Sequence, residues 1–383
     1  MDPCADSGET QGVIARVSHQ VQRGIRVLRG GVRARKSGDS RTIMINRRDF
    51  LKKSGRAALA VGGGFTIDAL LSGCATTRSA QEGPVVYPPL KGHKVKPPED
   101  GCYIGFHREY WYPFYESFVE KIGKKPKIMT VSVSMATSPT FFPKGAVRYI
   151  TSRGAIPFVY RDLGLDILLH GFGDLVENKE FRRNITNYAR ELVAFGKPIF
   201  VCTMRELNGN WFPWAKNPET ARKVWQLMWQ IFEDHGANEY ATWVWEVYCP
   251  PVGRKKIDPP EIYYPGDGYV DWIGLSAYAR TKYVGVTPSL VSLVARTYRD
   301  MRTNHPEKPI MQSEFGRTKD KRQPQWVKEA YQTMKSWPGM KAAIYWDSVN
   351  YGLGDDHTLR EASKKVLRGV LEDDYFIGGT RGR

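Results

Sequence analysis

The sequence predicts a single (β/α)8 barrel (TIM barrel), because short apolar runs alternate with longer segments of helical periodicity from about residue 100 onward. Eight such alternations over roughly 270 residues fit a closed barrel better than an open, doubly wound sheet. No GxGxxG or Walker A sequence follows any of these runs, so a nucleotide-binding fold is not indicated. With 41% hydrophobic and 25% charged residues, the chain has globular composition, which excludes collagen-like and low-complexity proteins.

The expected strands are short apolar runs rich in Ile, Val and aromatic residues, as buried parallel strands are. We expect them at residues 103–106, 128–133, 156–160, 199–204, 242–247, 272–277, 310–313 and 342–346.

The expected helices have apolar residues three and four positions apart, and Gly196 ends one of them before Lys197-Pro198 opens the next strand. They lie at residues 181–192, 224–231, 290–301, 326–337 and 359–370. In the last helix, the expected buried face consists of Leu359, Ala362, Val366 and Val370.

The N-terminal part of the chain has a different composition. Residues 1–73 hold 13 Lys and Arg against 6 Asp and Glu, which gives +7 of the total charge of +17. The segment 46–52, Asn-Arg-Arg-Asp-Phe-Leu-Lys, resembles a twin-arginine export signal, and the apolar run 57–71 that follows is too short to span a bilayer. Cys74 ends a Leu-Ser-Gly-Cys sequence that resembles a bacterial lipobox, in which the cysteine is acylated.

These features divide the chain. We expect a basic leader at 1–43, disordered or upstream of the true start, then a twin-arginine signal with lipobox at 44–73. A Pro-rich tether at 74–99, the barrel at 100–375 and a short tail at 376–383 follow. The protein would be exported by a bacterium and anchored in the membrane of the cell envelope through lipidated Cys74. A plain cleaved signal with an incidental cysteine, leaving a periplasmic or extracellular protein, is the alternative.

The remaining composition argues against several kinds of partner. Cys102, Cys202 and Cys249 permit at most one disulfide, and no Cys/His cluster has zinc-ligand spacing, so no metal site is expected. No sequence indicates an organic cofactor. The basic residues are dispersed among acidic ones without a binding motif, so we expect no nucleic-acid partner.

Carboxylates at the C-terminal ends of the strands are the candidate catalytic groups, because active sites of such barrels lie at that face. Two of them, Glu206 and Glu314, share a local context, since each follows a strand that begins with Lys-Pro-Ile. A pair of carboxyl groups at one mouth suits cleavage of a glycosidic bond: one donates a proton to the leaving oxygen while the other attacks the anomeric carbon. The strand-end acids are Glu109, Asp162, Glu206, Glu246, Glu314 and Asp347.

The surroundings of both glutamates resemble glycoside hydrolase family 26. The segment 206–214, Glu-Leu-Asn-Gly-Asn-Trp-Phe-Pro-Trp, is similar to the family's acid/base motif, and 308–316, Lys-Pro-Ile-Met-Gln-Ser-Glu-Phe-Gly, to its nucleophile motif. Between them, 263–275, Tyr-Tyr-Pro-Gly-Asp-Gly-Tyr-Val-Asp-Trp-Ile-Gly-Leu, continues the likeness. Motifs in the family's order span residues 100–370.

The resemblance implies a retaining hydrolase in which Glu206 is the acid/base and Glu314 the nucleophile. It implies endo-action on a β-linked polysaccharide, with β-1,4-mannan as the leading substrate. The substrate-binding residues implied by the motifs or by their position beside Glu206 are Arg205, Asn208, Trp211, Trp214, Tyr278 and Trp346.

Two positions depart from the family pattern. Family members carry His directly before the acid/base, where this chain has Arg205, and Arg four residues before it, where this chain has Cys202. An arginine beside Glu206 favours its ionised form unless the guanidinium points toward substrate or toward Glu314. Arg205 could alternatively hold an acidic sugar. Loss of catalysis is a further alternative, in which a surface lipoprotein binds polysaccharide on an inactive barrel.

Overall fold

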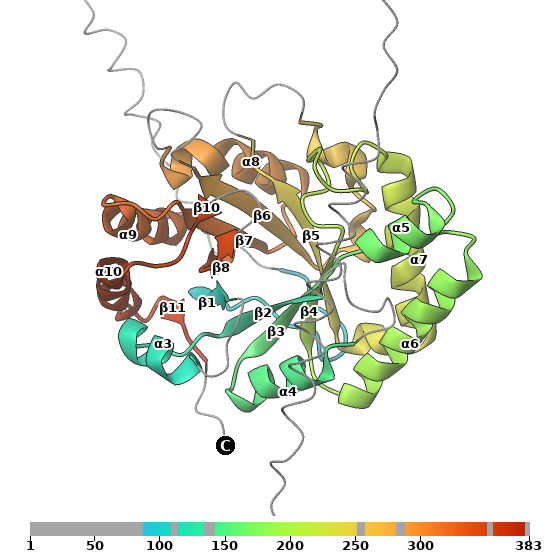
Figure 1. The fold of residues 1–383 in the computed structure, drawn as a ribbon, viewed down its shortest axis with the longest axis horizontal. Coiled ribbons are helices and arrows are strands. Elements are labelled where there is room, and N and C mark those ends of the chain that lie inside the picture. Colours follow the sequence, from blue (N-terminus) through green and yellow to red (C-terminus); the bar gives the residue numbers. More distant parts are fainter. Residues whose placement is uncertain are drawn as a thin grey trace, which may run out of the picture. The chain divides into compact units, whose positions relative to one another are not determined.

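The computed structural model describes residues 87–108, 114–133, 142–250, 257–280, 288–350 and 355–379. Eight parallel strands, β1 to β8, follow one another around a closed barrel in which β1 pairs with β8 (Figure 1). This confirms the predicted fold class, and each strand overlaps an expected one. The strands are Cys102–His107, Ile128–Val133, Ile156–Arg161, Ile199–Thr203, Ala241–Tyr248, Trp272–Ala279, Ile310–Arg317 and Met340–Trp346.

The helices surround the barrel (Figure 1). The five expected helices are present as α6 to α10, and the shorter α3, α4 and α5 were not predicted. Each of these three has nine residues or fewer, about two turns, which is too short to display a clear helical period. In chain order, helices α3 to α10 are Tyr115–Ile122, Lys144–Ser152, Gly164–His170, Lys179–Phe195, Pro218–Asp234, Leu290–Asn304, Gln323–Lys335 and Glu361–Leu371.

Short elements complete the described part of the chain. Strands β9 and β10 form a small antiparallel pair after β8, and β11 pairs with β1 in parallel. Their bounds are Val349–Asn350, Asp355–Asp356 and Phe376–Ile377, and the 3-10 helices η3, η4 and η5 are Ala237–Glu239, Pro260–Tyr263 and Asp267–Tyr269. Since β11 belongs to the sheet, the barrel domain extends past residue 375, where the tail was expected to begin.

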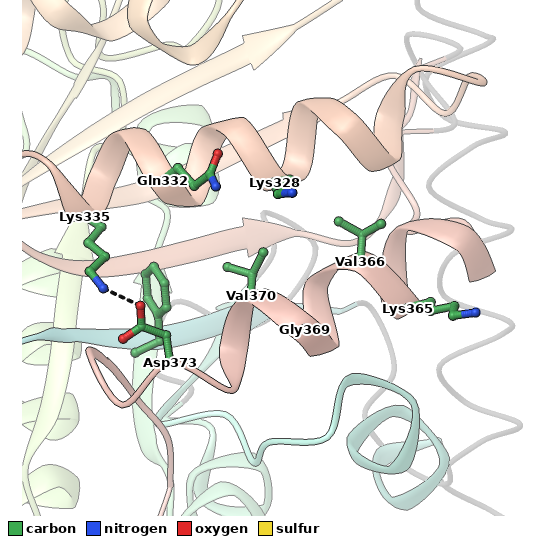
Figure 2. Close-up of a pocket in the computed structure, with 9 residues that line it drawn as sticks. Lys328, Gln332, Lys335, Lys365, Val366, Gly369, Val370 and Asp373 are labelled. Atoms are coloured by element: carbon green, nitrogen blue, oxygen red, sulfur yellow. Dashed lines mark hydrogen bonds and ion pairs between the residues drawn. The ribbon is translucent and has the colours of Figure 1, made fainter.

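The buried face of α10 differs from the expected one. Ser363 and Leu367 point into the core, whereas Val366 and Val370 are half-buried and line a groove of about 600 Å³ between α9 and α10 (Figure 2). Ser363 faces inward because its hydroxyl donates to Gln323 Oε1 at 2.7 Å. Of the expected buried residues, Leu359 is buried and Val370 packs against the core, whereas Ala362 is exposed. Hydropathy does not register a polar contact such as that of Ser363, so the apolar pattern predicted the buried face only in part.

Residues 87–99, which we call the N-terminal strap, were expected to form part of the Pro-rich tether. They lie instead against the end of the barrel where the strands begin. The Val95 amide donates to Thr242 Oγ1 at 2.8 Å, and Trp272 Nε1 donates to the Val95 carbonyl at 3.0 Å. The Val95 side chain joins the apolar cluster inside the barrel. The strap therefore closes this end of the barrel interior.

The expected leader, the export signal and Cys74 lie outside the described residues. Among the residues that are described, no helix combines the length and apolar character needed to cross a membrane.

We predict that the strap contributes to stability through Asp271. Its carboxylate accepts from Lys94 Nζ at 2.8 Å and from the Trp243 amide at 2.8 Å, in largely buried surroundings. Asp271→Ala leaves both donors without that partner and should lower the free energy of unfolding by about 2–4 kcal/mol. Urea denaturation measures the change. Glu219→Gln, which removes an exposed helix-surface pair with Lys223, is the control and should leave the midpoint unchanged. Equal midpoints for the two variants would contradict the prediction.

Candidate active site

The C-terminal ends of the barrel strands surround a cavity of about 360 Å³. Its lining combines carboxylates, guanidinium groups and aromatic rings, which is a mixture suited to a polar ligand with apolar faces. Six of the eight site residues expected from the sequence line it, namely Arg205, Glu206, Trp211, Tyr278, Glu314 and Trp346.

Glu206 is held in a strained turn directly after β4. Met204 and Glu206 have φ angles of 54° and 50°, in the left-handed region that costs a non-glycine residue about 1–2 kcal/mol. The turn directs the carboxylate into the cavity, where Oε1 accepts from Ser276 Oγ at 2.7 Å and Oε2 accepts from Trp211 Nε1 at 2.6 Å. Glu206 therefore has two neutral donors and a fixed orientation.

Glu314 lies on β7, in a stretch with irregular pairing to both neighbouring strands. The register with β8 passes from Gln312 directly to Phe315, and the register with β6 shifts between Gly274 and Ser276. Bulges of this kind redirect side chains next to active sites. Here the irregularity surrounds the residue that carries the carboxyl group.

The Glu314 carboxyl group has a neutral donor and a cation. Tyr278 donates its hydroxyl to Oε2 at 2.7 Å, and Arg205 Nη1 lies 3.5 Å from Oε1. Burial raises the pKa of Glu314 to about 7, Arg205 opposes that rise, and the charge of Glu206 adds to it. The Glu314 carboxyl group is therefore influenced by both Arg205 and Glu206.

Arg205 is directed toward Glu314 and Asp162. Its Nη2 donates to Asp162 Oδ2 at 3.0 Å, and its guanidinium lies over the rings of Tyr160, Phe212 and Trp346 at 5.4, 5.3 and 5.9 Å. Burial alone would lower the pKa of Arg205, but Asp162 and the neighbouring acids raise it overall, so the group stays charged. The cation therefore supports Glu314, as one of the sequence alternatives required.

Two tryptophans offer aromatic surface at the cavity. Trp346 stacks on His107 with ring centroids 3.5 Å apart, and burial lowers the pKa of His107 to about 3, so this imidazole is neutral. Trp211 is 40% exposed and contacts the Tyr248 ring edge to face at 4.8 Å. Sugars present apolar C–H faces to such rings.

Two expected substrate-binding residues, Asn208 and Trp214, are not among the side chains that line the cavity. Asn208 is fully buried, and its amide group both donates to the Tyr248 carbonyl at 2.9 Å and accepts from the Tyr248 amide at 2.8 Å. Trp214 is also buried and donates Nε1 to the Arg205 carbonyl at 2.9 Å. Both residues hold the segment after β4 in place, because their polar atoms are used within the protein.

Sequence reasoning missed several residues of the site. Asp162 and Glu246 were noted only as strand-end acids, and Phe212 only as part of the segment 206–214. Arg280 and His357 follow β6 and β10 without a recognisable motif, so no sequence signal points to them. The cavity-lining residues in the missed group are Phe212, Tyr248, Arg280 and His357.

No group of three or more His, Cys, Asp or Glu in the described ranges is arranged to hold a metal ion. The described cysteines, Cys102, Cys202 and Cys249, are buried and free.

The fold and cavity define a (β/α)8 barrel with two buried glutamates and aromatic rings at its mouth. Residues 175–341 match the model of Glycosyl hydrolase family 26, and this range includes both glutamates. The match supports the family resemblance that the motifs indicated.

Curated relatives align with parts of the chain. Endoglucanase H of Acetivibrio thermocellus is 27% identical over 186 residues, covering 46% of this chain and 20% of its own length. A beta-1,3-xylanase of a Vibrio species is 28% identical, covering 30% and 24%. A mannan endo-1,4-beta-mannosidase of Bacillus subtilis is 31% identical, covering 28% and 32%. The alignments thus span only about a fifth to a third of these relatives.

Solved structures share the fold. A family 26 beta-mannanase from Bacteroides ovatus superimposes with a TM-score of 0.55 at 14% identity, covering 73% of this chain and 91% of that one. A Cellulomonas fimi endo-beta-1,4-mannanase double mutant gives 0.56 at 14% identity, covering 73% and 72%. At these identities the likeness concerns the barrel architecture.

We predict that Tyr278→Phe raises the pKa of Glu314 by roughly one unit, because the hydroxyl bond that favours the carboxylate is lost. A ¹³C NMR titration of the glutamate carboxyl groups measures the change without requiring activity. Tyr331→Phe removes a hydroxyl with no hydrogen-bond partner among the described residues and is the matched control. An unchanged Glu314 titration in Tyr278→Phe would show that the hydroxyl does not stabilise the anion.

Proposed function

We propose that this protein is a family 26 glycoside hydrolase that cleaves a β-linked polysaccharide with retention of configuration. The observation that carries the proposal is the unequal support of two glutamates in one cavity. Glu314 receives a cation and a hydroxyl, whereas Glu206 receives two neutral donors. Pairs of carboxyl groups with different surroundings are the basis for assigning an acid and a nucleophile.

The surroundings suggest how the two groups divide their roles. Arg205 and Tyr278 favour the ionised form of Glu314, which a nucleophile requires. No cation is recorded on the Glu206 carboxyl group within the described residues. We therefore assign the role of nucleophile to Glu314 and that of acid/base to Glu206.

The reaction then proceeds in two balanced steps. Glu206 donates its proton to the glycosidic oxygen as that bond breaks, and a Glu314 oxygen bonds to the anomeric carbon. Glu206, now ionised, removes a proton from a water molecule that attacks the same carbon. The bond to Glu314 breaks, the sugar leaves with its original configuration, and both carboxyl groups return to their starting states.

The proposed substrate is a β-1,4-mannan or a related β-glycan. Mannan endo-1,4-beta-mannosidases are among the relatives, as are beta-1,3-xylanases and an endoglucanase. Trp346 and Trp211 provide the rings against which sugar faces would stack. An acidic sugar at Arg205 has less support, because it would compete with Asp162 and Glu314 for the guanidinium.

We predict that wild-type protein releases reducing ends from β-mannan, and that Glu314→Ala reduces release to background because no nucleophile remains. Glu206→Ala should lower turnover about 10²–10⁴-fold, the usual contribution of a general acid/base. Assays on β-mannan, β-1,3-xylan and mixed-linkage β-glucan identify the preferred linkage. The ¹H NMR signal of the first anomer formed tests retention.

Glu219→Gln, an exposed change on α7, is the control and should keep wild-type turnover. Full activity in Glu314→Ala would exclude the proposed nucleophile. Binding of a glycan by wild-type protein in affinity gels, with no turnover on any of them, would favour the polysaccharide-binding alternative. An inverted first product would exclude the double-displacement mechanism.

We also propose that the protein is exported and anchored in the cell envelope through acylated Cys74, on the strength of the twin-arginine and lipobox sequences. Cys74→Ala should move the protein from the membrane fraction to the soluble envelope fraction in a bacterial host. Cys4→Ala, upstream of the signal, is the control. Soluble wild-type protein with an unacylated Cys74, as read by mass spectrometry, would contradict the anchor.

A further inference from the structure

A third carboxyl group, that of Glu246, interacts electrostatically with both proposed catalytic glutamates. Glu246 is on β5 and is fully buried. Its Oε2 is 3.2 Å from the Tyr160 hydroxyl, and its Oε1 finds no hydrogen-bond partner among the described residues. An ionised carboxylate with so few donors is costly to bury, so its presence calls for a physical reason.

The Tyr160 hydroxyl supplies that reason, because it has two neighbours and a single proton. It lies 3.1 Å from the Ser313 carbonyl oxygen and 3.2 Å from Glu246 Oε2. A carbonyl oxygen can only accept. The arrangement that satisfies all three groups has Tyr160 donating to Ser313 and accepting a hydrogen bond from a protonated Glu246.

The hydrogen bonds from Glu246 through Tyr160 end at the Ser313 carbonyl, which lies in the irregular part of β7. Residues 313 and 314 have no registered partners on β8. Gly274 on β6 admits the Ser313 side chain, since a Cβ there would lie 2.8 Å from Ser313 Oγ. The hydrogen bond from Tyr160 can therefore hold the backbone of residues 313 and 314, which lacks pairing with β8.

We propose that Glu246 is a positioning residue: a buried neutral acid that, through Tyr160, fixes the Ser313 carbonyl and with it the orientation of Glu314. The same Tyr160 ring lies beneath the Arg205 guanidinium at 5.4 Å, so it contacts both the backbone before Glu314 and the cation beside it. The expected effect of Glu246 on kcat rests on the proposed function. The inference that Glu246 is protonated rests on the hydrogen bonds and does not depend on that function.

The groups around Glu246 agree with a neutral form. Burial, followed by the charge of Glu314, raises the pKa of Glu246 well above its usual value, with Glu206 adding to the rise. Arg205 and the neighbouring Ser313 side chain oppose this effect, although the Ser313 hydroxyl donates to the Leu275 carbonyl at 3.1 Å. The other titratable groups that face Glu246 from β3, β4 and β6 are Tyr160, Cys202 and Tyr278, whose pKa values burial raises, so all three are uncharged.

The kinetic test compares three variants. Glu246→Gln keeps a neutral donor and should retain most of the turnover and the pH profile. Glu246→Leu and Tyr160→Phe each break the chain of bonds and should lower kcat roughly 10- to 100-fold, as small misplacements of a reacting group do. A double variant that combines Glu246→Leu with Tyr160→Phe should lower kcat no further than either single variant does. Glu246→Gln as impaired as Glu246→Leu, or full activity in Tyr160→Phe, would overturn the proposal.

A second test needs no activity. A neutral Glu246 keeps its proton in the folded state, whereas in the unfolded chain a glutamate releases it above about pH 4.3. Wild-type stability should therefore fall relative to Glu246→Gln as the pH rises above that value. The Tm of Glu246→Gln minus the Tm of wild-type protein should therefore increase by several degrees from pH 4 to pH 7. A constant difference would show an ionised Glu246 and overturn the proposal.

The two proposals fail in different ways. If wild-type protein hydrolyses no glycan, the proposed function fails, but the Tm difference still tests whether Glu246 is neutral. Positioning is then read from the ¹³C titration of Glu314, which should move in both Tyr160→Phe and Glu246→Leu. An unmoved titration in both variants would overturn the positioning role.

Discussion

The Arg205 guanidinium, placed between Asp162 and Glu314 at the mouth of the barrel, is the interaction on which the site depends. It lies where water is largely excluded, so each carboxylate that it contacts would otherwise pay a desolvation cost without compensation. Its presence opposes the rise that burial imposes on the pKa of Glu314. The aromatic rings around it restrict its position and leave it limited freedom to turn toward solvent.

The cavity is supported by residues that do not line it. Trp214 holds the carbonyl of Arg205, and Asn208 joins the turn after β4 to the end of β5. These bonds offset the strain of the left-handed backbone at Glu206. The segment that resembled the family's acid/base motif is thus partly a structural motif, in which the polar side chains of Asn208 and Trp214 hold the loop that carries the Glu206 carboxyl group.

Most of the fold could be predicted from the sequence, because strands buried on both faces read as continuous apolar runs. The shortest helices and the buried face of α10 could not, since two-turn helices show little periodicity and Ser363 is buried by a hydrogen bond. Glu206 and Glu314 were identified by their motifs. The inward position of Glu246 and the contribution of His357 depend on three-dimensional packing that no local pattern records.

The position of the N-terminal strap determines which side of the barrel lies opposite the attachment point of any group joined before Tyr87. The Tyr87 hydroxyl donates to the carbonyl of Gly339, directly before β8 begins, so the described chain starts at the end of the barrel opposite the cavity. A bead, dye or fusion partner joined directly before Tyr87 would therefore be attached at the end of the barrel opposite the cavity. Long polymeric glycans could reach the open mouth without passing the point of attachment.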